Sequence, residues 1–63
     1  MPRNNEYLIE FIPQGRFVKV TAVDPVTGTE AVIVGDSRES QAVLSKNAVN
    51  KLEYMLKKAN PQG

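Results

Sequence analysis

Serine hydroxyls are the side chains of this sequence that come nearest to a catalytic group. Ser37, Ser40 and Ser45 would each need a neighbouring base before they could attack a substrate. The chain has no histidine and no cysteine, so the usual general base near neutral pH is missing. The same two residue types are the main ligands of zinc. The sequence therefore predicts no catalytic, cofactor-binding or metal site, and we expect that the protein is not an enzyme.

Two other groupings have plainer interpretations. Glu10 and Glu30 would project from the same side of a sheet beside Lys19, and we interpret them as a solvated charge cluster rather than an acid–base pair. Gly35 precedes a predicted helix, whose N-terminus could hold an anion with help from Arg38. Every helix N-terminus has this property, so the pattern does not indicate a specific site.

Length and composition narrow the class of protein. The 63 residues form one small domain, with an ordered core at about 6–59 and tails at 1–5 and 60–63. A domain of this size buries only about 60% of the surface of its unfolded chain, so its stability is marginal unless something adds to the core. The net charge of +1 implies neither a nucleic-acid nor a membrane partner. We expect a cytoplasmic protein, because secreted chains this short usually carry disulfides and no segment has the roughly 20 apolar residues of a membrane span.

A β-hairpin is predicted at 17–34, where two β-branched runs flank a turn. In the turn, Asp24 can accept a hydrogen bond from an amide two or three residues later, Pro25 presets the first φ angle, and Gly28 can adopt the left-handed conformation. A four-residue loop of this kind pairs Asp24 with Thr29. Counting outward from that pair gives one wholly apolar face and one mixed face, which is typical of a sheet covered on one side.

Another strand is predicted at 6–12, where the sequence alternates, but its register depends on the turn that follows. A three-residue loop would put Leu8 and Glu10 on the apolar face. A two-residue loop, either Gln14-Gly15 or Gly15-Arg16, would put the alternate residues there. We favour the two-residue loop because it keeps Glu10 out of the core. The apolar face then consists of Tyr7, Ile9, Phe11, Val18, Val20, Ala22, Ala31 and Ile33.

A C-terminal helix is predicted from about Arg38 to Lys58. Asp36 with Glu39 three residues later resembles a capping box, and Ser37 is the alternative N-cap. The apolar residues of the helix fall in an arc of roughly 160°, as expected of a helix that lies on a sheet: Ala42, Leu44, Ala48, Val49, Leu52, Met55, Leu56 and Ala59. The sequence thus predicts an α+β fold, a three-stranded antiparallel β-meander with one C-terminal α-helix packed on one face.

The hairpin and the helix also carry a family resemblance. Its most specific pieces are Lys-Val-Thr-Ala-Val-Asp-Pro at 19–25 and Lys-Leu-Glu-Tyr at 51–54, within a similarity that covers about residues 6–58. They resemble a family of short, uncharacterised, mainly alphaproteobacterial proteins classed as a domain of unknown function. The resemblance implies this fold and a bacterial cytoplasmic protein, and it implies no activity, cofactor or partner.

The uncovered face of the sheet is the first candidate for a contact surface. Six apolar side chains on so small a domain would form a patch on the order of several hundred square ångströms, a size that usually marks an interaction site. We expect a homodimer, formed either face to face or by pairing of the edge strand at 31–34, which has little to discourage pairing. The alternative is a monomer with ordinary exposed valines. The predicted self-association residues are Leu8, Ile12, Phe17, Val32 and Val34.

The side of the helix away from the sheet is the second candidate. Val43, Tyr54 and Lys58 would form a partner surface with the tyrosine as its anchor, unless this side is a plain solvated face. Our leading hypothesis is a non-enzymatic protein-interaction module that self-associates. The alternative is a weak nucleic-acid binder, in which lysines contact phosphates and the tyrosine stacks on a base. Its residues would be Lys46, Lys51, Tyr54, Lys57 and Lys58.

Overall fold

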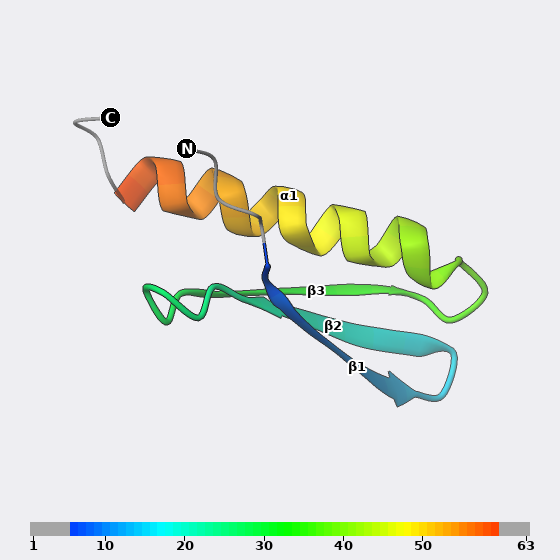
Figure 1. The fold of residues 1–63 in the computed structure, drawn as a ribbon. Helices are drawn as coiled ribbons and strands as arrows, with labels where there is room; N and C mark the ends of the chain where they lie inside the picture. The colour runs from blue at the N-terminus through cyan, green and yellow to red at the C-terminus, as the bar shows by residue number, and fades with distance from the viewer. Residues whose placement is uncertain (1–5, 60–63) are drawn as a thin grey trace.

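The computed structural model describes residues 6–59 and shows the predicted order of elements (Figure 1). Strands β1 (Leu8–Gln14), β2 (Phe17–Val23) and β3 (Glu30–Asp36) form one antiparallel sheet in the order β1-β2-β3. Helix α1 (Gln41–Ala59) follows and packs on one face. The predicted α+β meander with a C-terminal helix is confirmed. The predicted tails at 1–5 and 60–63, and the side chain of Ala59, lie outside the described residues.

The loop between β2 and β3 has the predicted length and register. The Asp24 N–H donates to the Thr29 carbonyl at 2.9 Å, and the pairs that follow along both strands match the outward count. The Asp24 carboxylate accepts hydrogen bonds from the Val26 N–H at 3.0 Å and from the Thr27 hydroxyl at 3.2 Å. Gly28 has a φ of +80°, in the left-handed region that favours glycine. Asp24 is thus buried with both carboxylate oxygens satisfied, and it holds the loop closed.

A two-residue loop, Gly15-Arg16, joins β1 to β2. Gln14 pairs directly with Phe17, and Gly15 has a φ of +66°. The register predicted from the apolar pattern is therefore confirmed, with Glu10 on the uncovered face opposite Thr21. The bounds of the first strand differ from the prediction. Because the tight loop lets pairing continue to its edge, β1 ends at Gln14 instead of residue 12, and it begins at Leu8.

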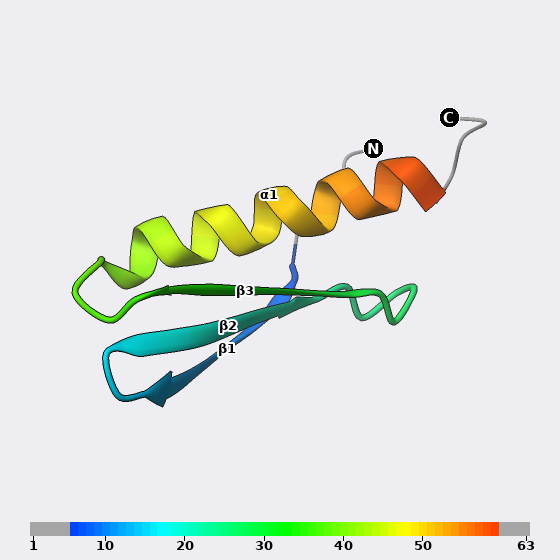
Figure 2. The ribbon, with the colours of Figure 1, turned by 180° about the vertical axis from the view of Figure 1, so that it is seen from behind.

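The core lies between α1 and the two strands β2 and β3, over which the helix runs (Figure 2). Alternate strand residues and every fourth helix residue meet there, as their periods of two and 3.6 require. The buried residues are Val18, Val20, Ala22, Ala31, Leu44, Ala48 and Leu52. In β1 and just before it, the same face carries Tyr7, Ile9 and Phe11, which pack against this core but stay only partly buried. The sheet is therefore wider than the helix that covers it.

The capping prediction for α1 is wrong in its position. The helix begins at Gln41, and the N-cap is Ser40, whose Oγ accepts the Val43 N–H at 3.2 Å. The reason is that β3 continues to Asp36, two residues beyond the predicted end of the strand, so a turn over 37–40 must come before the helix. Ala42, at the margin of the predicted apolar arc, lies in the first turn of the helix and is exposed.

The two residues predicted as caps serve the turn instead. Asp36 accepts the Arg38 N–H on Oδ1 at 2.8 Å, and its carbonyl accepts the Glu39 N–H at 2.9 Å. The Ser37 N–H donates to the Arg16 carbonyl at 3.0 Å, which ties this turn to the neighbouring loop. The spacing of Asp36 and Glu39 therefore marks a tight turn rather than a capping box.

Candidate functional site

The face of the sheet opposite α1, here called the open face, brings all five predicted self-association residues together. Leu8, Phe17, Val32 and Val34 are 60%, 57%, 38% and 66% exposed, and Ile12 is partly buried. The strand register places the side chains of this face in four rows: Leu8, Val23 and Glu30; Glu10, Thr21 and Val32; Ile12, Lys19 and Val34; Gln14, Phe17 and Asp36. The sheet is thus covered on one side only, as its one apolar face and one mixed face predicted.

Lys19 lies at the centre of the most apolar part of this face. Its cross-strand neighbours are Ile12 and Val34, and Phe17 lies two residues before it on β2. The lysine is partly buried, so its hydrocarbon stem extends the apolar surface while its ammonium can reach solvent. This arrangement is suited to contact with another protein surface.

The carboxylates of the open face do not form an acid–base pair. Glu10 is on β1 and Glu30 is on β3, both exposed, and β2 runs between them. Neighbouring strands lie about 4.8 Å apart, which separates the two strands by about 10 Å. The predicted solvated cluster fits their exposure.

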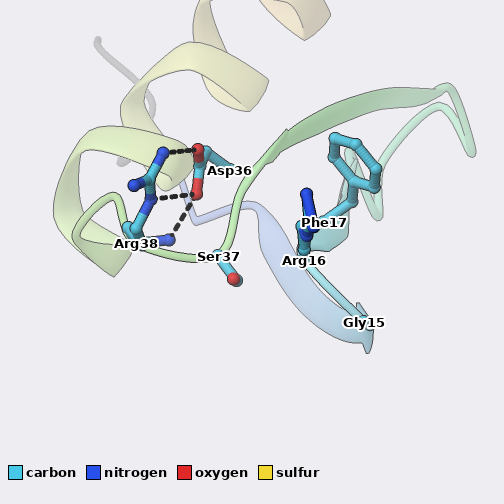
Figure 3. Close-up of a pocket in the computed structure, with 6 residues that line it drawn as sticks. All are labelled: Gly15, Arg16, Phe17, Asp36, Ser37 and Arg38. Atoms are coloured by element: carbon cyan, nitrogen blue, oxygen red, sulfur yellow. Dashed lines mark hydrogen bonds and ion pairs between the residues drawn. The ribbon is translucent and has the colours of Figure 1, made fainter.

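A hollow lies at the end of the sheet where the loop between β1 and β2 meets the turn after β3. Its lining includes Arg16, Asp36 and Arg38 (Figure 3). Arg38 donates to both carboxylate oxygens of Asp36, through Nε at 3.2 Å and Nη2 at 2.9 Å. The Arg38 side chain and then its backbone N–H lower the pKa of the Asp36 carboxyl, and the same contact raises the pKa of Arg38. The carboxylate of Asp36 thus binds Nε and Nη2 of the Arg38 guanidinium.

Gly35 also has a role other than the one its sequence context suggested. It lies within β3, opposite Val18 on the covered face, and α1 begins six residues later, at Gln41. A Cβ at this position would overlap Cδ2 of Leu44. The glycine therefore lets Leu44, near the start of the helix, approach the sheet closely.

Lys51 connects the helix to the edge of the sheet, a contact that the sequence analysis did not predict. Its Nζ reaches from α1 to the carbonyl of Val32 at 2.8 Å. The sequence prediction that this edge strand has little to discourage pairing did not include this contact, in which a helix lysine binds one of the strand's carbonyls. Pairing at this edge stays a prediction. The sequence did contain a signal: Lys51 adjoins the buried Leu52 and lies at the margin of the apolar stripe of the helix.

The back of the helix brings together only part of its predicted surface. Lys58 Nζ lies 5.7 Å from the centre of the Tyr54 ring, a cation–π contact. Val43 is exposed but lies eleven residues before Tyr54, or about 16 Å along a helix. Of the five residues predicted for nucleic acid, Lys51 binds Val32 and Lys58 lies over the tyrosine ring that was to stack on a base. Tyr54 and Lys58 therefore form a small joint surface without Val43.

The sequence model of one protein family, described as Domain of unknown function (DUF6898), matches residues 4–59. The chain belongs to this family. No curated protein and no solved structure matches it. The predicted class of the DUF6898 chain, a domain of unknown function, is thereby confirmed, and its alphaproteobacterial range stays a prediction.

Two other kinds of feature, a metal site and a membrane span, are absent from the described part of the DUF6898 chain. Within residues 6–59, no three or more histidine, cysteine or acidic side chains gather as they would around a metal ion. No helix of the same residues has the length and apolar character that a membrane span requires. The open face is therefore the candidate site that this family member offers.

Proposed function

We propose that this DUF6898 chain is a non-enzymatic protein-interaction module that self-associates through its open face. The observation that supports it is the gathering of Leu8, Phe17, Val32 and Val34, each at least 38% exposed, on the one face that α1 leaves uncovered. Single exposed apolar residues are ordinary, but a cluster on one face is typical of a contact surface.

The size of the chain supports the same proposal. Its core consists of seven buried residues, all between α1 and two of the strands. A second copy packed on the open face would give each sheet two covered faces, at the spacing of about 10 Å that packed sheets adopt. Association would therefore add apolar burial where the single chain has least of it.

The charges of the open face suit a second copy. Lys19 lies one row along the sheet from Glu10 on the neighbouring strand, so the face has both signs of charge close together. A copy related by a twofold axis presents the same set in reverse, which lets Lys19 of one copy approach a glutamate of the other. Such complementary pairs fix orientation more than they raise affinity.

Tyr54 and Lys58 remain accessible in this assembly, since they lie on the helix and not on the sheet. We assign them to contact with a different protein, in keeping with the enrichment of tyrosine at interfaces. Replacing Tyr54 with alanine should then leave the mass of the assembly unchanged. A bacterial cytoplasmic location stays a prediction of the sequence.

The experiment compares Val34→Lys with Val43→Lys by sedimentation equilibrium. Val34 is the most exposed of the four apolar residues on the open face, and Val43 is an exposed valine on the helix. Because a lysine at position 34 would face Lys19 across the strands, circular dichroism first establishes that Val34→Lys is folded. We expect Val34→Lys to weaken dimerisation at least tenfold, which corresponds to about 1.4 kcal/mol, and Val43→Lys to leave it unchanged. An association constant of Val34→Lys equal to that of the wild type would overturn the open face as the contact surface.

A further inference from the structure

The two edges of the sheet differ in how they are protected. The hydrogen bond from the Asp24 N–H to the Thr29 carbonyl marks a hydrogen-bonded pair, and such pairs alternate along an antiparallel ladder. The backbone groups of Val32 and Val34 therefore point away from β2, toward the outer edge of β3. Lys51 Nζ binds the outward carbonyl of Val32 at 2.8 Å. This edge is blocked at its middle.

Among residues 6–59, no helix side chain binds a backbone group of β1 in the way that Lys51 binds Val32. The two-residue loop makes Gln14 and Phe17 a hydrogen-bonded pair, so the backbone groups of Ile9, Phe11 and Pro13 point outward. Because the backbone nitrogen of Pro13 points outward, its lack of an N–H costs no hydrogen bond to β2. This explains how a proline is accommodated inside the strand. Ile9 and Phe11 keep an outward N–H and C=O, and these groups can accept another strand.

The side chains above this edge are also incompletely covered. Because α1 runs over β2 and β3, Ile9 and Phe11 are only partly buried on the helix side of the sheet. A small hollow of about 160 Å³ opens between Phe11, Pro13 and the start of α1. Outward backbone groups and half-buried apolar side chains therefore occur together on one strand.

We propose that a second copy of the chain adds its β1 antiparallel to this edge, with the twofold axis at Ile9, to form a continuous six-stranded sheet. Outward groups belong to odd-numbered residues, and Ile9 and Phe11 face themselves or each other only when the axis lies at Ile9, Glu10 or Phe11. An axis at Glu10 would set two Glu10 side chains directly opposite each other, which is destabilising. An axis at Phe11 would pair Ile9 with Pro13, which lacks the N–H to complete the ladder.

The axis at Ile9 avoids both problems. It sets Ile9 against Ile9 and Tyr7 against Phe11 on the helix side, so the three partly buried residues of each copy cover one another. On the other side Leu8 lies opposite Glu10, and no like charges meet. The chain is thus complementary to itself at this register, which is the reason for choosing a second copy as the occupant of the edge.

This inference goes beyond the proposed function, because it uses a different surface. The open face remains exposed in the six-stranded sheet, so both contacts can exist in one assembly of four copies. In such an assembly two six-stranded sheets would meet by their open faces, with the helices outside. Loss of either contact alone should leave a dimer held by the other.

The chain has no cysteine, so a single cysteine introduced at a chosen position can form a disulfide only with the same position of a second copy. In single-cysteine variants, Ile9→Cys should form a disulfide-linked dimer at least tenfold faster than Val43→Cys. Facing residues of a hydrogen-bonded pair have Cα atoms about 5.5 Å apart, a separation that a disulfide spans. Phe11→Cys should not exceed the control, because its two copies would be offset by four residues, or about 14 Å. The proposal would be overturned if Phe11→Cys or Glu10→Cys formed the disulfide-linked dimer faster than Ile9→Cys does. It would also be overturned if Ile9→Cys formed it no faster than Val43→Cys.

Two further measurements separate this proposal from the open face. The Ile9→Cys linkage rate should be unchanged when Val34→Lys is added, whereas a lost linkage would assign the contact to the open face. In the wild type, hydrogen exchange at the Ile9 and Phe11 amides should slow as protein concentration rises. Exchange rates that do not change with concentration would contradict strand pairing, whatever Val34→Lys does to the mass.

Discussion

The covered face and the open face of the sheet are built from the same kinds of residue and behave differently. Val20 on the covered face is 0% exposed and Val34 on the open face is 66% exposed. Both lie in strands, whose successive side chains point to opposite faces, so β-branched residues occur on both sides of the sheet. What differs is α1, which covers one side. Stability is therefore concentrated on the covered face, and the apolar residues of the open face stay exposed.

The largest effect should come from truncating the helix side of the core. Leu52 is fully buried, and Leu52→Ala should lower the free energy of unfolding by about 2–5 kcal/mol. In a domain this small that loss is enough to unfold much of the protein. The matched control is Leu8→Ala on the open face, which should change the free energy by less than about 0.5 kcal/mol at concentrations where the chain is monomeric. Urea denaturation followed by circular dichroism measures both, and equal losses would break the comparison.

Gly35→Ala should have the next largest effect, because a Cβ there would overlap Leu44. We expect a loss of about 1–3 kcal/mol, the range for overpacking a core. The control is a double-mutant cycle with Leu44→Ala, since removing the overlapping side chain should relieve the strain. Additive losses in urea denaturation would show that the two residues do not meet.

The position of the helix cap predicts a smaller loss. Ser40→Ala removes the acceptor of the Val43 N–H and should cost about 1 kcal/mol. Ser37→Ala is the control, because its side chain lies exposed in the turn, and it should change stability by less than about 0.5 kcal/mol. If Ser37→Ala lost more stability than Ser40→Ala in thermal or urea unfolding, Ser37 would be the N-cap, the alternative predicted from the sequence.

Lys51→Met should leave stability almost unchanged and alter association instead. The lysine contact with Val32 is exposed, so its loss should change the free energy of unfolding by less than about 1 kcal/mol. The freed carbonyl makes the β3 edge available for pairing, and the mass should rise more steeply with concentration than in Lys46→Met. Identical sedimentation of the two variants would show that Lys51 does not protect the edge.

The smallest effect should be a pH dependence at the loop end of the sheet. Arg38 lowers the pKa of Asp36 below its ordinary value of 3.8, so the folded state is stabilised above that pH. This stabilisation is lost as the pH falls through the lowered pKa. The stability difference between wild type and Asp36→Asn should therefore vanish in acid and be present at neutral pH. Urea denaturation at both pH values tests this, and a difference that grows in acid would have the wrong sign.

Most of the fold could be predicted because turn chemistry and alternation agree. Asp24 and Gly28 fix the second loop, and the need to keep Glu10 out of the core selects the first loop. The open face followed from the same register. Its exposure depends on α1 covering one side alone, which the single helix of the predicted fold already implied.

The helix start and the protected edge could not be predicted, for two physical reasons. Asp36 and Glu39 have the spacing of a capping box, but hydrogen bonds at a turn and at a cap use the same residue types. The contact of Lys51 with Val32 depends on how far the helix lies across the sheet, which periodicity does not specify. The incomplete burial of Ile9 and Phe11 on β1 also depends on how far the helix lies across the sheet.

Sedimentation equilibrium of the wild-type chain, from about ten to several hundred micromolar, tests the central proposal most directly. An apolar open face that serves as a contact surface predicts a mass that rises with concentration from 7.0 kDa toward a multiple of that value. A mass of 7.0 kDa at every concentration would contradict self-association and would make the open face a tolerated apolar surface.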